Sequence, residues 1–187
     1  MDHDLVAAVD TLREGGLILY PTDTIWGIGC DATNEEAVTR VYTVKQRQDE
    51  KSLLVLLDKA DKLPEYIAEV PEMAWNLIEI SDKPLTIIYP GAQNLARNLI
   101  AEDGSIGIRI VKDEFCRQMI RRFGKPVVST SANISGMPWP PNFRKIDRSI
   151  IKSVDYVVNH KQKDTTHGKP SGIIKLGEGG VVKVIRE

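Results

Sequence analysis

Hydrophobic and polar residues follow two kinds of pattern along this chain. Apolar positions recur at helical spacing near residues 5–12, 34–45, 59–69, 71–80 and 113–123. Short apolar runs of strand length lie between and after these segments, at 17–20, 25–28, 53–57, 85–89, 106–111, 126–129, 156–158, 172–176 and 181–185. Helices and strands therefore interleave for most of the chain, and strands dominate its end. This order predicts an α/β fold on a twisted mixed sheet, parallel and antiparallel, with flanking helices.

Local signals sharpen the limits of several elements. Gly15 and Gly16 are typical of the end of a helix, and Gly124 has the same meaning after residue 123. Asn34 is a good N-cap for the second helix, because acidic residues fill the first turn that follows it. The long segments 132–142 and 159–170 are rich in Pro, Gly, Asn, Lys and Thr, which favours binding loops or lids, with disorder as the other interpretation.

Length and composition limit the class of protein. With 187 residues and 42% hydrophobic content, residues 1–187 are expected to form a single domain with a real core. No stretch approaches the roughly 20 apolar residues of a membrane span, and the acidic N-terminus lacks a secretory signal. Cys30 and Cys116 are too few for a disulfide framework and fit a reducing compartment. We expect a cytoplasmic protein.

The distribution of charge is more informative than its total. The net charge of −1 excludes a globally basic nucleic-acid binder. Residues 58–82 carry seven acids against two bases, whereas residues 115–153 carry eight bases against one acid. A solvated helix face explains part of this difference, and a positive region that attracts nucleotide phosphates or RNA is the alternative.

Several familiar sites are excluded by their spacing. The phosphate-binding motif Gly-x-x-x-x-Gly-Lys-Ser/Thr does not occur, and the three histidines are not spaced with the cysteines as zinc ligands. Residues 27–32 match a loose dinucleotide fingerprint. However, the next helix is expected to begin only near Asn34, and the fingerprint requires a helix that opens on the glycines. The sequence therefore predicts no Rossmann site.

Two polar segments follow predicted strands. Pro21-Thr22-Asp23-Thr24 is either an ordinary turn or the lining of a pocket, because hydroxyls at a strand end can bind a polar substrate. Ser129-Thr130-Ser131-Ala132-Asn133-Ile134-Ser135-Gly136 follows the strand that begins at Pro126. Such a run of hydroxyls exceeds what a turn needs, and ligands usually bind at this edge of an α/β sheet. We predict a binding loop there.

Cationic residues supply further candidates. Lys45 and Arg47 lie at the end of a predicted helix, where they complement its dipole or bind phosphate and carboxylate groups. Arg109 lies on an alternating strand, from which it reaches either solvent or a cleft that holds a carboxylate. Ser171, after the second long loop, and Arg186, near the end, complete the set.

Taken in order, these motifs resemble the threonylcarbamoyl-adenylate synthase family, whose members have the YrdC-like fold. The resemblance runs from about Leu5 to the end of the chain and fits the short, bacterial-type form. It rests on Pro-Thr-Asp-Thr and Trp-Gly-Ile-Gly-Cys-Asp-Ala at 21–32, Lys-x-Arg at 45–47, Gly-Ile-Arg at 107–109, and Ser-x-Asn within 129–136.

The resemblance implies a nucleotidyltransferase that makes threonylcarbamoyl-AMP and pyrophosphate from L-threonine, bicarbonate or CO₂, and ATP. The product would serve the threonylcarbamoylation of adenosine 37 in tRNA, so tRNA and the tRNA threonylcarbamoyl-transferase complex are implied partners. Mg²⁺ would accompany ATP, with no metal ligand from protein side chains. A positive concave surface is also implied, in a monomer or a homodimer.

The same resemblance assigns roles to the candidate residues. Lys45 and Arg47 would offset the repulsion between the reacting anions. Arg109 would hold the threonine carboxylate, with Thr22, Thr24 and Ser129 near the amino acid. The nucleotide would be bound by Lys45, Arg47, Ser131, Asn133, Ser171 and Arg186, and Lys45, Arg47, Ser131 and Asn133 would form the catalytic set.

The chain departs from the family pattern at Gln48, Ser52 and Gly172, where relatives often have proline, proline and a hydroxyl residue. Two other functions compete with the synthase. One is a non-catalytic RNA-binding module that kept the fold and binds tRNA or rRNA. The other, ranked third, is a relative that transfers carbamoyl groups from carbamoyl phosphate, since such domains usually lie within much larger chains.

Overall fold

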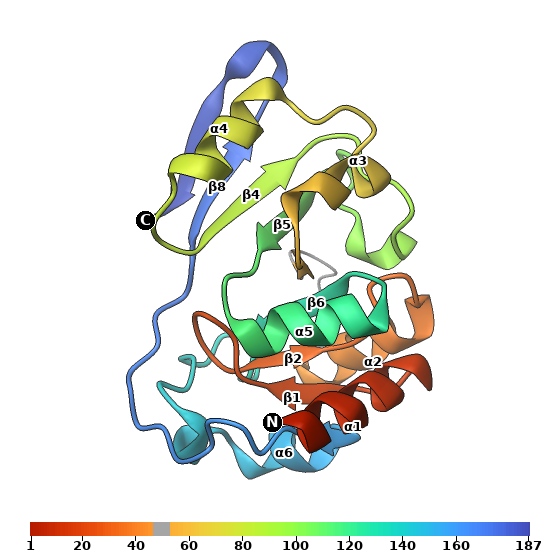
Figure 1. The fold of residues 1–187 in the computed structure, drawn as a ribbon, viewed down its shortest axis with the longest axis vertical. Helices are drawn as coiled ribbons and strands as arrows, with labels where there is room; N and C mark the ends of the chain where they lie inside the picture. Colours follow the sequence, from red (N-terminus) through yellow and green to blue (C-terminus); the bar gives the residue numbers. More distant parts are fainter. Residues whose placement is uncertain (47–52) are drawn as a thin grey trace.

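The computed structural model describes residues 1–46 and 53–187, and its centre is one mixed sheet (Figure 1). Over the described residues, nine strands follow the order β7-β1-β2-β6-β3-β5-β4-β8-β9. The pairs β1–β7, β3–β5 and β4–β8 are parallel and the others antiparallel, as predicted. The bounds are β1 Ile18–Tyr20, β2 Gly27–Gly29, β3 Leu54–Leu57, β4 Leu85–Tyr89, β5 Ile106–Ile110, β6 Val127–Ser131, β7 Tyr156–Val157, β8 Gly172–Leu176 and β9 Val182–Arg186.

Helices cover both faces of the sheet. Side chains alternate between faces along a strand, so Ile18 and Tyr20 of β1 join one hydrophobic cluster and Leu19 joins the other. The helices α1 (Asp2–Arg13) and α5 (Glu114–Phe123) pack side by side in the first cluster (Figure 1). The second cluster receives buried side chains from α2 (Glu35–Val44), α3 (Leu63–Tyr66), α4 (Glu72–Ile80) and α6 (Arg148–Ser153).

Short-range capping fixes the ends of the longer helices. The side-chain oxygen of Asn34 accepts a hydrogen bond from Ala37 N at 3.0 Å, and Asp113 accepts one from Cys116 N at the same distance. Gly124 ends α5 in the left-handed conformation, with φ of +81°. The predicted ends at Asn34 and Gly124 are therefore confirmed.

Two predictions about elements are wrong, and one helix was not predicted. The single helix expected over 59–69 is replaced by a 3₁₀ turn, Ala60–Lys62, and the four-residue α3, because Pro64 lies in the first turn of α3 and starts a new helix. The strand expected to end at 129 extends to Ser131. The helix α6 was not expected, since its six residues are too few for a periodic pattern.

The glycines of the loose dinucleotide fingerprint have a structural role in the sheet. Gly27 and Gly29 bound the strand β2, and no helix opens until Glu35. A Cβ on Gly29 would lie 2.6 Å from Cε1 of Tyr20 and 2.7 Å from the carbonyl oxygen of Val128. The residue is therefore glycine because neighbouring strands occupy that space.

The basic segment 115–153 is divided between the two faces. Its first half lies on α5, in the cluster with α1, whereas Ile146 and Ile150 anchor its second half in the opposite cluster. Part of the charge is also compensated, since Lys125 pairs with Asp31 at 3.0 Å. Of the two interpretations of this segment, the structure therefore favours solvated faces of separate elements over one positive region.

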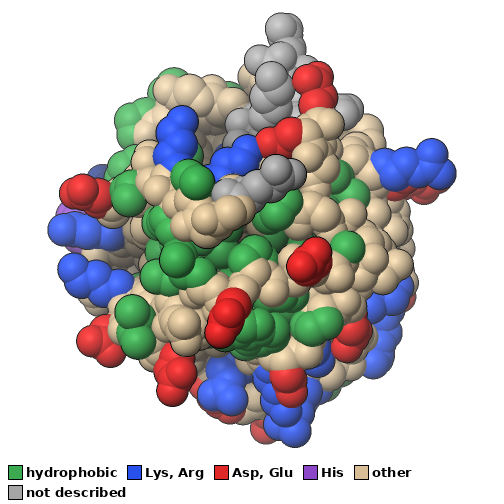
Figure 2. Space-filling model, turned by 90° about the horizontal axis from the view of Figure 1, so that it is seen from above, with side chains coloured by type: hydrophobic (Ala, Val, Ile, Leu, Met, Phe, Trp, Pro, Cys, Tyr) green, Lys and Arg blue, Asp and Glu red, His purple; other side chains and the backbone are tan. Residues whose placement is uncertain are grey.

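Exposed hydrophobic side chains gather at the end of the molecule that holds α4 and β9 (Figure 2). They are Met73, Trp75 and Ile80 of α4, and Val181, Val182, Val184 and Ile185 in and before β9. None of the helices in the described ranges is both long enough and apolar enough to cross a membrane.

Candidate active site

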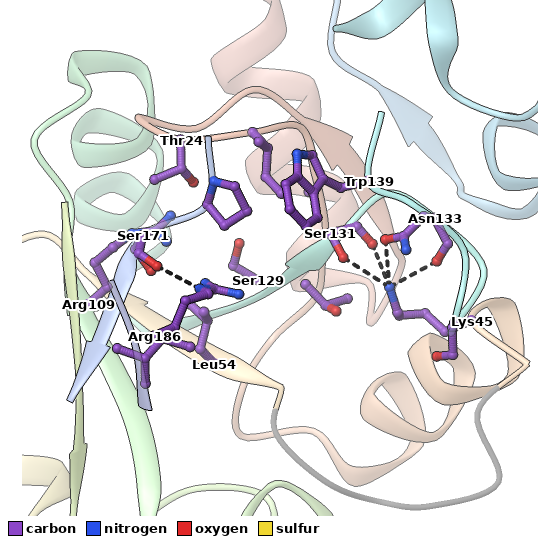
Figure 3. A pocket seen from close by; sticks show the side chains of 17 residues that line it. Thr24, Lys45, Leu54, Arg109, Ser129, Ser131, Asn133, Trp139, Ser171 and Arg186 are labelled. Atoms are coloured by element: carbon purple, nitrogen blue, oxygen red, sulfur yellow. Dashed lines mark hydrogen bonds between the residues drawn. The ribbon is translucent and has the colours of Figure 1, made fainter. Parts of the chain in front are cut away.

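A cavity of about 340 Å³ lies where β2, β3, β5 and β6 meet the final hairpin (Figure 3). The strand β6 explains why polar groups gather there: Val127 and Val128 are buried apolar residues, and Ser129 to Ser131 follow in the same strand. Pairing brings Ser129 opposite Leu54 and Ser131 opposite Gly27. The side chains of β6 therefore pass from the hydrophobic core to the lining of the cavity along this one strand.

The pocket occupies an open part of the face that α1 and α5 cover elsewhere. Leu56 belongs to the cluster with these helices, and it lies opposite Arg109 in the register of β3 and β5. Ser129 lies two residues after Val127 of the same cluster and thus on the same face. The guanidinium and the hydroxyl line the cavity where the helical cover ends.

Lys45 connects the end of α2 to the end of β6. Its side chain is 2% exposed, and Nζ donates to the carbonyl oxygens of Ser131 at 2.6 Å and Asn133 at 2.9 Å (Figure 3). The Ser131 hydroxyl and the Asn133 side-chain oxygen lie 3.4 and 3.3 Å from Nζ. These four oxygens belong to neutral groups. The ammonium therefore holds the residues of the Ser-x-Asn motif together.

Arg109 and Asp23 form a buried ion pair beside the cavity. Nη2 of Arg109 lies 3.1 Å from Oδ1 of Asp23, and the side chains are 3% and 9% exposed. Asp23 Oδ2 also accepts a hydrogen bond from Lys112 N at 3.1 Å. Nε of Arg109 is buried with no hydrogen-bond partner in the part of the chain that the structure describes. The ion pair fixes the position of the guanidinium, and Nε of Arg109 remains able to donate a hydrogen bond to a ligand.

Arg186 reaches the cavity from the last strand. Its Nε donates to the carbonyl oxygen of Ser171 at 2.9 Å (Figure 3). The hydroxyl of Ser171 lies 2.8 Å from that of Thr86. Partial burial and the positive charge of Arg109 both lower the pKa of the Arg186 guanidinium. Two cations that repel each other across a pocket favour an anion between them.

Most of the predicted site residues meet in this cavity. Its lining includes Thr24, Lys45, Arg109, Ser129, Ser131, Asn133, Ser171 and Arg186. Thr22 lies beside this cavity and lines a second one of about 720 Å³. Its buried hydroxyl donates to the carbonyl oxygen of Ile25 at 2.7 Å, lies 2.9 Å from the Thr24 hydroxyl and accepts a hydrogen bond from Nη2 of Arg109 at 3.5 Å. Arg47, Gln48 and Ser52 lie outside the described residues, whereas Gly172 borders the second cavity.

The electrostatic character of the first cavity distinguishes it from the second. Its described lining contains three cationic side chains, Lys45, Arg109 and Arg186, and no carboxylate. The larger cavity mixes both signs, with lysines 83, 161 and 169 beside Asp23, Asp164 and Glu187. A multiply charged anion therefore fits the first cavity better.

The segment 159–170 passes beside the site. Gly168 N donates to the carbonyl oxygen of Pro141 at 3.2 Å, and a Cβ on Gly168 would lie 2.1 Å from the carbonyl oxygen of Thr24. Only glycine permits this close approach. Pro170, at the end of the segment, lines both cavities, so the segment forms part of the wall.

Sequence reasoning did not single out several residues in or beside the cavity. Asp23 was visible only as part of Pro-Thr-Asp-Thr, and its partner Arg109 is far away in the sequence. Trp139 and Ser135 lie in or beside segments expected to bind, without a signal of their own. Leu54 lies in a strand that was predicted only as core.

The sequence was compared with protein families and with curated proteins. The Sua5/YciO/YrdC family model, described as telomere recombination, matches residues 10–187. A protein of Pseudoalteromonas translucida (strain TAC 125) named threonylcarbamoyl-AMP synthase is 30% identical over 182 residues, which are 96% of each chain.

Solved structures show the same fold. The structure of P. abyssi Sua5 complexed with L-threonine matches with a TM-score of 0.81 and 26% identity, over 94% of this chain. This chain spans about half, 51%, of that longer protein. E. coli YciO matches over 100% of this chain and 90% of its own length with a TM-score of 0.86, and its 24% identity shows the fold alone.

Proposed function

This chain belongs to the Sua5/YciO/YrdC family, and from that premise we propose that it is a threonylcarbamoyl-AMP synthase. Its substrates would be L-threonine, bicarbonate or CO₂, and ATP, and its products threonylcarbamoyl-AMP and pyrophosphate. The observation that carries the proposal is the cavity with three cations, several hydroxyls and, among its described lining, no carboxylate. Such a cavity suits the two anionic substrates of this reaction.

The first step joins threonine to the one-carbon substrate. The threonine amino group attacks the carbon of CO₂ and releases a proton, which gives a carbamate; from bicarbonate, that proton leaves with the hydroxide as water. Arg109 would bind the threonine carboxylate, because Asp23 fixes its guanidinium and its Nε has no partner within the described residues. The hydroxyls of Thr24 and Ser129 line the same cavity and would orient the amino acid.

The second step transfers the adenylyl group. A carbamate oxygen attacks the α-phosphorus of ATP, and the bond from that phosphorus to the oxygen bridging to the β-phosphate breaks, releasing pyrophosphate. Two unit charges of like sign at 4 Å cost about 4 kcal/mol at an effective dielectric constant near 20. Lys45, Arg186 and, from the sequence, Arg47 would offset this repulsion. Catalysis then rests on positioning and electrostatics.

Mg²⁺ would enter with ATP. Because the described lining of the cavity offers hydroxyls but no carboxylate, phosphate oxygens and water would supply most ligands of the ion. The ion would neutralise part of the charge on the departing pyrophosphate. We propose that the product then serves the modification of adenosine 37 in tRNA by the threonylcarbamoyl-transferase complex.

The direct test is pyrophosphate release by the purified protein with labelled bicarbonate, L-threonine, ATP and Mg²⁺, with and without threonine. Threonine-dependent release is expected, together with a labelled adenylate. Lys45→Met should reduce it at least 100-fold, because the ammonium at the Ser-x-Asn motif is lost. Lys152→Met, which changes an exposed lysine on α6, is the matched control and should leave the rate unchanged.

The competing RNA-binding module predicts another outcome. Folded protein that binds tRNA tightly but releases no pyrophosphate with all substrates present would replace the synthase by that module. The division of the basic segment 115–153 between two faces favours the synthase, since a polyanion needs a continuous positive surface.

A further inference from the structure

The apolar face of the sheet extends beyond the helix that covers it. A small cavity of about 50 Å³ is lined by Ile78 of α4 together with Leu85 and Ile87 of β4, so α4 covers this face of β4. In the strand register, Ile87 lies opposite Ile174 of β8, and Ile174 lies opposite Val184 of β9. Opposite residues of neighbouring strands share a face, and these three are 1%, 9% and 60% exposed, in that order. The hydrophobic row therefore reaches solvent at β9.

A second row of the same face ends in the same way. Leu176 of β8 is buried, whereas Val182 of β9, which lies opposite it, is 41% exposed. Lys183 lies between Val182 and Val184 in the strand, so its side chain starts from the other face of β9. The face of β9 that continues the core is therefore apolar and uncovered.

The neighbouring helix α4 adds acidic and further apolar side chains. Met73 and Ile80 are exposed and lie seven residues apart, hence on one side of the helix, and Glu72 and Glu79 form a parallel exposed row. Neither glutamate makes an ion pair within residues 1–46 and 53–187, and α4 contains no base. Figure 2 shows acidic side chains among the hydrophobic ones at this end of the molecule. Such an apolar surface with polar groups around it is typical of an interaction site.

The spacing of the elements indicates what fits this surface. Neighbouring strands lie about 4.8 Å apart, so β9 is about 10 Å from β4, with β8 between them. Packed helices also lie about 8–10 Å apart. A helix that packs beside α4 would therefore lie over β8 and β9 and bury Val182 and Val184, as α4 buries the apolar side chains of β4.

We propose that this face, made of Val182 and Val184 with the adjoining side of α4, binds an amphipathic helix of a partner protein. The apolar stripe of that helix covers the two valines, and its Lys or Arg residues meet Glu72 and Glu79. A second copy of this chain fits less well, because packing α4 against its counterpart brings like charges together. None of these residues lines the candidate active site, so the inference does not depend on the proposed function.

A synthetic peptide serves as the probe for this partner. It is about 18 residues long, with leucines on one side of the helix and lysines elsewhere. Two control peptides keep its length: one has Glu in place of Lys, and the other has the same composition with the leucines dispersed around the helix. Fluorescence anisotropy of the labelled peptides measures binding to the full chain. The first peptide should bind at least tenfold more tightly than either control.

Variants of the protein locate the peptide on its surface. Val184→Ser and Ile80→Ser should each weaken the lysine peptide at least fivefold, whereas Val6→Ser, at an exposed position of α1, should leave its affinity unchanged. Because all three side chains are exposed, thermal unfolding followed by circular dichroism should be nearly the same in the three variants.

The charge requirement is tested separately. The double variant Glu72→Gln and Glu79→Gln should weaken the lysine peptide about fivefold and reduce the dependence of its Kd on salt, whereas Glu36→Gln on α2 should change neither.

Three outcomes would overturn the proposal. One is equal affinity for the lysine and glutamate peptides, and another is unchanged affinity in both Val184→Ser and Ile80→Ser. The third is a dimer in sedimentation experiments that Val184→Ser dissociates, since a second copy of the chain would then occupy the face.

Discussion

The buried pair of Arg109 and Asp23 is the residue-scale feature on which substrate recognition depends. Both side chains are at least nine-tenths buried, and removing one partner of such a pair typically costs about 3–5 kcal/mol, because the other charge remains buried. The pair also has a directional effect, since Asp23 engages Nη2 and leaves Nε without a partner among the described residues. Asp23 is therefore a positioning residue for the guanidinium.

Asp23→Asn tests this arrangement. The amide keeps the size of the carboxylate but loses its charge, so we expect the KM for L-threonine to rise about tenfold or more, while the dissociation constant of ATP changes less than twofold. The free energy of unfolding should fall by about 3 kcal/mol in urea titrations. Asp10→Asn is the matched control, because its pair with Arg13 is exposed and worth less than about 1 kcal/mol. An unchanged KM for threonine would remove Asp23 from substrate recognition.

At the scale of elements, one carboxylate ties α1 to the chain that follows β7. Asp4 Oδ1 accepts hydrogen bonds from the Tyr156 hydroxyl at 2.7 Å and from Asn159 N at 3.0 Å, and Oδ2 accepts one from His160 N at 3.0 Å. Burial alone would raise the pKa of Asp4. The hydrogen bonds outweigh burial, and the pKa lies below its ordinary value of 3.8. These hydrogen bonds therefore hold the start of the segment 159–170 against α1.

The pKa shift gives the pH dependence of this connection. Because the pKa is lower in the folded than in the unfolded chain, the ionised carboxylate stabilises the fold above about 3.8, and this stabilisation is lost as the pH falls through the folded pKa. We expect Asp4→Asn to lower the free energy of unfolding by about 1–3 kcal/mol at pH 7 and by much less at pH 3. Urea titrations at both pH values measure this, with the exposed Asp82→Asn as control. An equal deficit at both pH values would contradict it.

Elements set by local signals were predictable from the sequence. The cap at Asn34 and the glycine at 124 act within one turn, so neighbouring residues suffice to identify them. The helix expected over 59–69 failed because its apolar spacing concealed the effect of Pro64. Residues 130 and 131 were expected in a loop because a run of polar side chains is uncommon in a central strand, and they are polar there because they line the cavity.

The candidate site was predictable only in part, because only some of its residues give a local signal. Hydroxyl and cationic residues at the ends of strands and helices indicate a binding site by their chemical type. This signal identified Lys45, Ser131 and Arg186 from the sequence. The role of Asp23 depends on its partner Arg109, which lies on β5 and comes beside Asp23 only when the sheet has formed. No local pattern carries that information.

At the scale of the whole molecule, the cavity joins distant parts of the sheet. Its lining runs from Thr24, near the start of the chain, to Arg186, in β9 at the edge of the sheet. The residues of β9 are exposed throughout, and β9 pairs with β8 alone among the described strands. An edge strand with little burial opens easily. A ligand that binds Arg186 would keep β9 paired with β8.

Hydrogen exchange tests this coupling. We expect amides 182–186 to exchange quickly in the free protein and at least tenfold more slowly with saturating ATP, because bound ligand stabilises the closed state by mass action, about 2.7 kcal/mol at 100 times Kd. Arg186→Ala should abolish the protection, whereas Lys183→Ala, which changes an exposed lysine of the same strand that does not line the cavity, should retain it. Protection of equal size in both variants would mean that ATP stabilises the fold without engaging Arg186. The last strand would then be structural, and the cationic wall of the site would consist of Lys45 and Arg109 within the described residues.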